Sequence, residues 1–161
     1  MADRDYRSEE ASLEPRADTK LGASDLFVAG SDRAFGADRF YGNYTSFERT
    51  KSWYAMLHQG LGAKTEAAVA YRRHTDRFVL FRDNPGIYTN QHKDESWEGL
   101  LQRNDSFGTH LELASGLEED LDAIQSNNLG HHARNRGAGY LQFTWAQPRR
   151  RGCPWAAAKR C

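Results

Sequence analysis

Cysteine is missing from the first 152 residues of this 161-residue chain, since the only two, Cys153 and Cys161, lie near its end. Most of the chain therefore has neither a disulfide framework nor a cysteine metal site. Net charge is lacking too, because 22 Lys and Arg balance 22 Asp and Glu. A balanced chain has no overall electrostatic footprint for nucleic acid or for an anionic membrane surface.

Long hydrophobic runs are also absent. No run approaches the roughly 18 to 20 apolar residues of a spanning helix, and the first residues carry no recognisable signal peptide. A transmembrane β-strand stays possible, because it needs only about 9 to 11 residues with apolar side chains at alternate positions. The aromatic content of 12% exceeds what a disordered chain would carry.

The motifs of the common enzyme classes do not occur. There is no GxGxxG, P-loop, nucleophile elbow or CxxC, so we expect no enzyme, no catalytic residue and no cofactor. The six histidines lack the helical i, i+4 spacing and the cysteine partners of a zinc site, so we expect no metal. Arginines at 72–77 and 149–151 resemble a nucleic-acid patch, but the zero net charge argues against that partner.

Alternation of apolar and polar residues is what the chain does have. From Ser52 to Gln59, Trp53, Ala55 and Leu57 share one face, which is typical of a β-strand. The alternation resumes after the short turn from Gly60 to Lys64, so residues 51–81 form one predicted hairpin. Further strands are expected at 96–103, 110–118 and 138–145.

The connections differ in length. The turns at 60–64 and 104–109 are short, whereas the expected loops at 30–47, 82–95 and 120–136 are long and all fall at the same end. Outer-membrane barrels have this arrangement of turns and loops. One predicted face is apolar with Trp and Tyr near strand ends, like an aromatic girdle, and the other carries Glu, His, Arg and Gln, like a polar lumen.

Two stretches resemble the barrel of TonB-dependent outer-membrane receptors. They are FGADRFYGNYTSFERTKSWYAMLHQGLGAKTEAAVAYRRHTDRFVLFRDNPGIYTNQH and SNNLGHHARNRGAGYLQF. The resemblance covers residues 20–146 and implies import of a siderophore-like or other scarce solute by the parent protein, without catalytic chemistry. It also implies location in the outer membrane, with lipid, the remaining barrel strands, the plug and a solute at the external loops as partners, and no nucleic acid.

Members of that family have a signal peptide, an energy-coupling box, a plug and a barrel of about 22 strands. This sequence offers five or six strands and none of the other parts, so we expect a piece of a barrel from a truncated or frameshifted reading frame. The main alternative is a small soluble β-barrel or β-sandwich that acts as a ligand-binding module, and an enzyme is the third possibility.

The predicted fold is thus all-β, an antiparallel meander of five to six long strands that forms part of a large transmembrane β-barrel, with disordered N- and C-terminal tails. Residues 1–19 are expected to be a flexible charged lead-in, 20–146 the partial barrel, and 147–161 an aberrant tail rich in Arg and Cys. The candidate ligand contacts, on loops, are Arg39, Phe40, Tyr41, Tyr44, Tyr88, Asn90, His92, His131 and Arg134.

Overall fold

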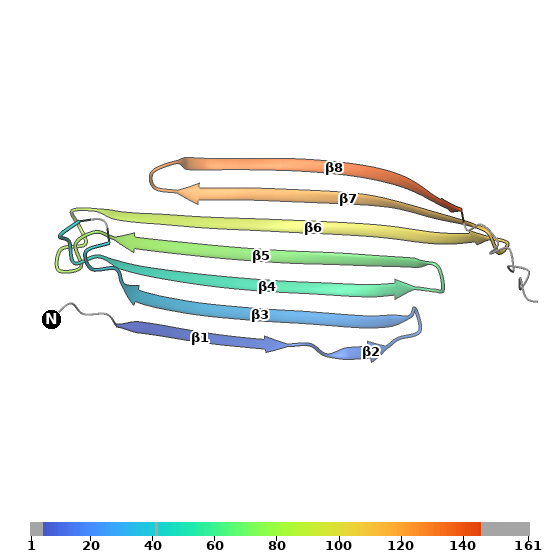
Figure 1. Ribbon diagram of the computed structural model, residues 1–161, viewed down its shortest axis with the longest axis horizontal. Helices are drawn as coiled ribbons and strands as arrows, with labels where there is room; N and C mark the ends of the chain where they lie inside the picture. Colours follow the sequence, from blue (N-terminus) through green and yellow to red (C-terminus); the bar gives the residue numbers. More distant parts are fainter. Residues whose placement is uncertain (1–4, 41, 146–161) are drawn as a thin grey trace, which may run out of the picture.

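The computed structural model describes residues 5–40 and 42–145, which form one antiparallel sheet (Figure 1). Its strands are β1 (Tyr6–Leu13), β2 (Arg16–Asp18), β3 (Ala23–Gly36), β4 (Phe47–Leu61), β5 (Thr65–Val79), β6 (Thr89–Phe107), β7 (Leu111–Ser126) and β8 (Gly130–Trp145). The predicted all-β antiparallel meander is confirmed, with eight strands where we expected five or six. No helix able to cross a membrane occurs among the described residues.

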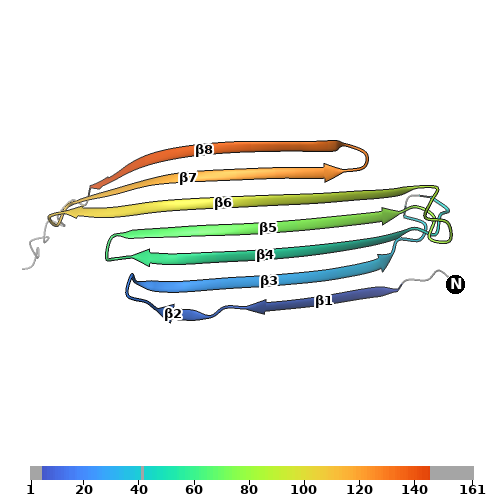
Figure 2. The ribbon, with the colours of Figure 1, turned by 180° about the vertical axis from the view of Figure 1, so that it is seen from behind.

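The strands follow one another across the sheet in the order β1-β3-β4-β5-β6-β7-β8, and β2 continues the edge by pairing with β3. Figures 1 and 2 show a single layer from both sides, with no second sheet against either face. Among the described residues, β1 and β8 pair on one side only. The sheet therefore has two open edges.

The hairpin expected over residues 51–81 is confirmed as β4 and β5. Trp53 lies opposite Arg73, and the pairing continues without a bulge from Phe47 to Leu61. Gly62 makes the reversal possible because its φ of 75° lies in the left-handed region that L side chains rarely adopt. The second short turn, between β6 and β7, uses Gly108 in the same way, with a φ of 66°.

Residues 6–13 and 16–18 lie in strands, although we expected a flexible lead-in there. Eight consecutive residues of β1 pair with β3. Cross-strand ion pairs join the two sides, since Arg33 donates to Glu10 and Arg16 donates to Asp25. Charged side chains occupy both faces of this segment, so apolar and polar residues do not alternate along it. The sequence pattern therefore does not predict these strands.

The prediction of a long loop over residues 120–136 is wrong. β7 continues to Ser126 and β8 begins at Gly130, so only three residues connect them. Asp122 and Asp120 of β7 pair with Arg134 and Arg136 of β8. The hairpin therefore continues through a stretch whose polar sequence is typical of a loop. The other two long connections exist but are shorter than the predicted 30–47 and 82–95: they span residues 37–46 and 80–88, because β3 continues to Gly36 and β6 begins at Thr89. The predicted tail at 147–161 lies outside the described residues.

The sheet has almost no core. Ala37, Ala70 and Val79 are the buried hydrophobic residues among those described, and Ser46 is the buried polar one. The accessible surface is 12788 Å², whereas a compact protein of this mass would expose roughly 8,000 Å². Both faces of the layer are therefore open.

Candidate functional site

The pairing of the strands shows which side chains lie on the same face of the sheet. Because residues directly opposite each other project to the same side, the register assigns every strand position to one face. We call the face that carries Trp53, Tyr71 and Trp97 the apolar face. The face that carries Ser52, His74 and their cross-strand partners is the polar face.

Exposed hydrophobic side chains of the strands are concentrated on the apolar face. With the exception of Tyr6, every exposed large hydrophobic residue of the described strands projects from it. They are Leu13, Leu26, Trp53, Leu57, Leu61, Val69, Trp97, Leu101, Phe107, Leu117, Leu121, Leu141, Phe143 and Trp145. Glu119, level with Leu57 and Val69, is a charged exception within this surface, and Arg103 and Asp105, between Leu101 and Phe107 on β6, are two more.

An aromatic row borders this apolar surface on the side of the long loops. The rings of Tyr71 and Trp97 pack with centroids 4.6 Å apart, and Trp53 lies against Gly30, whose missing side chain leaves room for the indole ring. Trp53 and Trp97 stay half exposed, at 57% and 51%. Aromatic residues with one apolar and one polar neighbourhood are typical of the margins of a membrane-facing surface.

The apolar surface slants across the strands. Through successive cross-strand partners, Trp53 of β4 is level with Ala133 of β8. On β8, however, the exposed hydrophobic residues begin only at Leu141. The strands therefore run at an angle to the apolar surface, as the tilted strands of barrels do.

Next to the long loops, the polar face holds a cluster of polar side chains from β4, β5 and β6. Asp76 lies directly opposite His92, and the amide nitrogen of Asn90 lies 2.8 Å from His92 Nε2. Asp76 Oδ1, Asn90 Oδ1 and His92 Nδ1 are shielded from solvent and lack a hydrogen-bond partner among the described residues. Buried unpaired polar atoms are rare in folded proteins, and a polar ligand reaches these three only if the side chains that cover them move aside.

The surroundings of this cluster are polar as well. Ser52 Oγ lies 2.8 Å from His74 Nδ1. Burial raises the pKa of Glu48, and the nearby negative charge of Asp76 raises it further. The carboxyl group of Glu48 therefore stays protonated to a higher pH than an exposed one, which allows it to donate a hydrogen bond.

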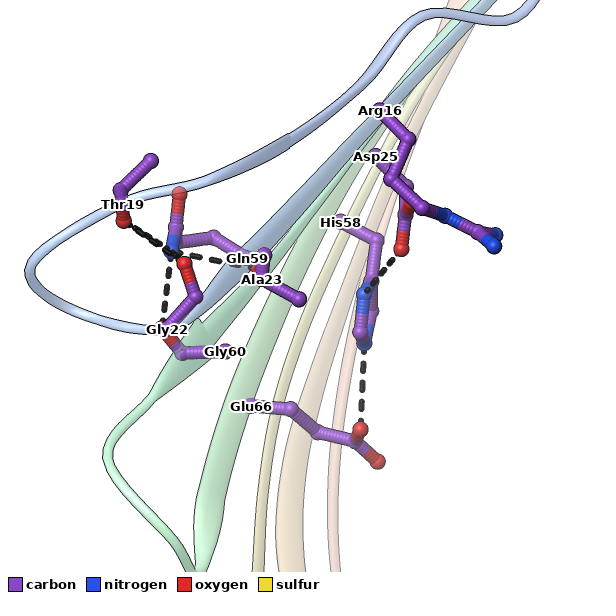
Figure 3. A network of polar contacts seen from close by, with 9 residues as sticks. All are labelled: Arg16, Thr19, Gly22, Ala23, Asp25, His58, Gln59, Gly60 and Glu66. Carbon is purple, nitrogen blue, oxygen red and sulfur yellow. Dashed lines mark hydrogen bonds and ion pairs between the residues drawn. The ribbon is translucent and has the colours of Figure 1, made fainter.

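At the other end of the polar face, a chain of contacts joins four strands (Figure 3). His58 lies 3.1 Å from Glu66 Oε2 and 3.7 Å from Asp25 Oδ2, and Arg16 holds Asp25. Nearby, the side chain of Gln59 donates to backbone carbonyl oxygens, such as Gly60 O at 2.8 Å, and fastens the turn before β3. No group of side chains that could hold a metal ion occurs among the described residues.

The first predicted contacts lie on the loop over residues 37–46. Arg39 has a φ of 63°, and its backbone N–H donates to the carbonyl oxygen of Tyr44 at 3.1 Å, which closes the loop. Phe40 is 76% exposed. Tyr44 packs its ring against Phe81 of the second loop, with centroids 5.3 Å apart. Tyr41 lies outside the described residues.

The other predicted contacts, except Tyr88, do not lie on loops as expected: they are strand residues of β6 and β8, and strand geometry separates them onto two faces. Asn90 and His92 lie together on the polar face, close to Tyr88, whose ring packs against Phe78 at 6.5 Å. Arg134 is on the polar face of β8 and binds Asp122, whereas His131 is on the apolar face. Asp76, which the register brings opposite His92, was not among the predicted contacts, although its alternation with Arg72 and His74 places it on the polar face.

Comparison with known proteins identifies no relative. No family model matches the chain, and no curated protein and no solved structure matches it. The distribution of side chains over the two faces is thus the basis for assigning a function.

Proposed function

We propose that the chain is part of the β-barrel of a TonB-dependent outer-membrane receptor. The apolar face contacts lipid, and the polar face lines the lumen. The intact receptor binds a siderophore-like or other scarce solute at its loops and imports it without catalytic chemistry. The isolated chain does not transport, because import requires the rest of the barrel and the plug.

The observation that carries the proposal is the concentration of exposed large hydrophobic side chains on one face of a sheet without a core. Soluble monomers rarely expose continuous apolar patches beyond a few hundred Å². Contact with lipid tails keeps the hydrophobic side chains of such a surface out of water. The polar groups of the opposite face need water, which a lumen supplies.

The open edges support a segment of a larger barrel. β1 and β8 each have one strand neighbour among the described residues, and the backbone N–H and C=O groups of an unpaired edge cannot be satisfied in lipid. Adjoining strands of a parent barrel would pair with both edges. Two of the three connections at the loop end, 37–46 and 80–88, are long, as external loops are.

The solute would meet the polar face below these loops. Asp76, Asn90 and His92 supply unpaired polar atoms there, and Tyr88 and Tyr44 add aromatic surface from the loops. A solute rich in hydroxyl or amide groups suits this combination.

Depth-dependent fluorescence quenching tests the proposal. The full chain is folded into phosphatidylcholine vesicles whose acyl chains carry bromine at defined depths. Tryptophan emission should be quenched, and Trp97→Phe should reduce the quenching that arises near the margin of the bilayer. A protein that stays in water as a monomer with a cooperative melt would overturn the membrane assignment and favour the soluble binding module.

A matched pair of variants checks which face meets lipid. Leu101 and Leu100 are neighbours on β6 but project from opposite faces. Leu101→Arg should lower the stability of the inserted protein by about 2–4 kcal/mol, the usual cost of an arginine on the lipid face. Leu100→Arg should change it little, and equal losses for both variants would argue against a lipid-facing side.

A further inference from the structure

A hollow of about 740 Å³ lies beyond the aromatic row, toward the long loops. Its walls come from β4 to β8, and Arg49, Lys51, Arg77, Lys93 and His131 contribute to them. The register places all five on the apolar face. This end of the face therefore changes abruptly from hydrophobic to basic.

The charge in this region is unbalanced, although the chain as a whole is neutral. Asp32 binds both Arg49 and Lys51, at 2.6 and 3.4 Å. Glu95 of the same face binds Lys93 at 2.7 Å and lies 3.9 Å from Arg73. Glu9 lies opposite Asp32 on the same face and is paired with Arg7. Three carboxylates thus face five cations, and Arg77 adds a sixth positive charge next to them.

Two of these cations are direct cross-strand neighbours. Arg49 of β4 lies opposite Arg77 of β5, a position in which like charges destabilise a sheet. An anion bound between them would remove the repulsion, and a phosphate group fits the planar, multiply donating guanidinium groups.

The position of the hollow indicates which phosphate would bind. Lys51 lies two residues beyond Trp53, toward the loops and away from the apolar surface, and Arg49 and Arg77 lie further out, four residues beyond Trp53 and six beyond Tyr71. Phosphate groups of lipids lie just outside the hydrocarbon core that aromatic girdles mark, so Lys51 meets them first and the two arginines extend the basic surface outward. Basic side chains at that level attract anionic headgroups.

We propose that Arg49, Lys51, Arg77 and Lys93 form a binding site for the phosphate groups of anionic lipid headgroups at the loop end of the sheet. The site rests on the proposed insertion into a membrane. It selects lipid by charge, independently of the solute that the polar face binds.

Partitioning of the full chain tests this site. The chain is diluted from denaturant into vesicles of phosphatidylcholine alone or of phosphatidylcholine with phosphatidic acid, and the bound fraction is measured by flotation. We expect preference for the anionic vesicles. Arg77→Gln should reduce that preference about fivefold, and Arg49→Gln combined with Arg77→Gln should reduce it further. Binding to phosphatidylcholine alone should not change.

Arg72→Gln is the matched control, because Arg72 precedes Arg73 on β5 and projects from the polar face; it should keep the preference. Equal effects of Arg72→Gln and Arg77→Gln would overturn the site. Inorganic phosphate should weaken the preference more than chloride of equal ionic strength, because it competes for the same side chains. Equal effects of the two anions would show that screening of diffuse charge sets the preference and would overturn the site. Absence of acyl-chain quenching in both kinds of vesicle would instead overturn the membrane assignment, and this site with it.

Discussion

Arg82 binds the carboxylate of Asp5 through two hydrogen bonds, of 3.0 and 2.5 Å, across 77 positions of the sequence. Arg82 stands in the connection between β5 and β6, and Asp5 directly precedes β1. The backbone N–H of Arg82 also donates to the carbonyl oxygen of Thr45 at 2.8 Å, and its guanidinium group lies over the ring of Phe47, 5.1 Å from the centroid. Arg82 therefore joins Asp5 and the start of β4 through its side chain, and the loop over residues 37–46 through its backbone N–H.

Arg82→Gln should loosen the two long loops without unfolding the strands. The substitution removes the bidentate ion pair and the cation–π contact, whereas the ladders of β4 and β5 do not depend on either. Amides of residues 37–46 and 80–88 should exchange hydrogen faster, and those of β5 should keep their protection. Hydrogen exchange followed by mass spectrometry in detergent micelles measures both regions at once.

Arg7→Gln provides the comparison for this variant. Arg7 makes its ion pair with Glu9 on the same strand, and both side chains are largely exposed. Such a pair contributes little to stability. Faster loop exchange in Arg7→Gln as well would mean that the Asp5–Arg82 contact has no special part in holding the loops.

Gly116 on the polar face of β7 is covered by the ring of Tyr140 from β8. A Cβ atom at Gly116 would lie 2.5 Å from that ring, and the Tyr140 hydroxyl donates to Gln102 Oε1 at 2.7 Å. Gly116→Ala should therefore displace the ring and cost about 1–3 kcal/mol. At Gly99 a Cβ would meet its nearest neighbour only at 4.0 Å, so Gly99→Ala should cost much less. Urea unfolding in micelles compares the two, and equal losses would contradict the packing argument.

The sequence predicts those strands whose two faces differ in polarity. Trp53, Ala55 and Leu57 stand out against their polar neighbours, and the strand there is confirmed. β1 and the loop ends of β7 and β8 carry polar side chains on both faces, so period-two alternation has no contrast to detect. Cross-strand ion pairs such as Arg134 with Asp122 accompany the strand structure there, and these can be recognised only once the register is known.

Which of the candidate ligand contacts lie together also depends on the strands and their register. Asn90 and His92 are two residues apart, so they share a face on any strand. His131 and Arg134 are three residues apart, and strand geometry puts them on opposite faces where a loop would have allowed them to converge. Asp76 lies next to His92 only because β5 pairs with β6 in this register. The sequence alone does not determine that register.

Asn127 should be essential for the short connection between β7 and β8. Its side chain accepts a hydrogen bond from the Gln91 N–H at 2.9 Å and donates to the Thr89 carbonyl oxygen at 2.7 Å. These two hydrogen bonds pair backbone groups of β6 that lie past the end of β7 and have no strand partner there. Asn127→Ala leaves both groups unpaired and should cost about 1–3 kcal/mol. Asn128→Ala is the control, because the Asn128 side chain reaches only the exposed hydroxyl of Tyr88 at 3.3 Å. A loss as large for Asn128→Ala would contradict this role.

Asp32 should make the stability of the sheet depend on acid pH. Hydrogen bonds and positive charge from Arg49, with a further contribution from Lys51, lower the pKa of Asp32 from 3.8 to about 2. A carboxyl group with a lowered pKa stabilises the folded state above its unfolded pKa, and this contribution is lost as the pH falls from 3.8 through about 2. Asp32→Asn should therefore lower the urea midpoint at neutral pH and make no difference below pH 2.

Asp18→Asn supplies the comparison for the acid series, because Asp18 is an exposed acid on β2, at the edge of the sheet, and makes no ion pair of its own among the described residues. Its substitution should leave the midpoint unchanged throughout the titration. High salt should shrink the effect of Asp32→Asn at neutral pH, since the side chains involved are partly exposed and their charges are screened. A deficit of Asp32→Asn that persists unchanged in strong acid would show that Asp32 stabilises the sheet by packing and not by its charge.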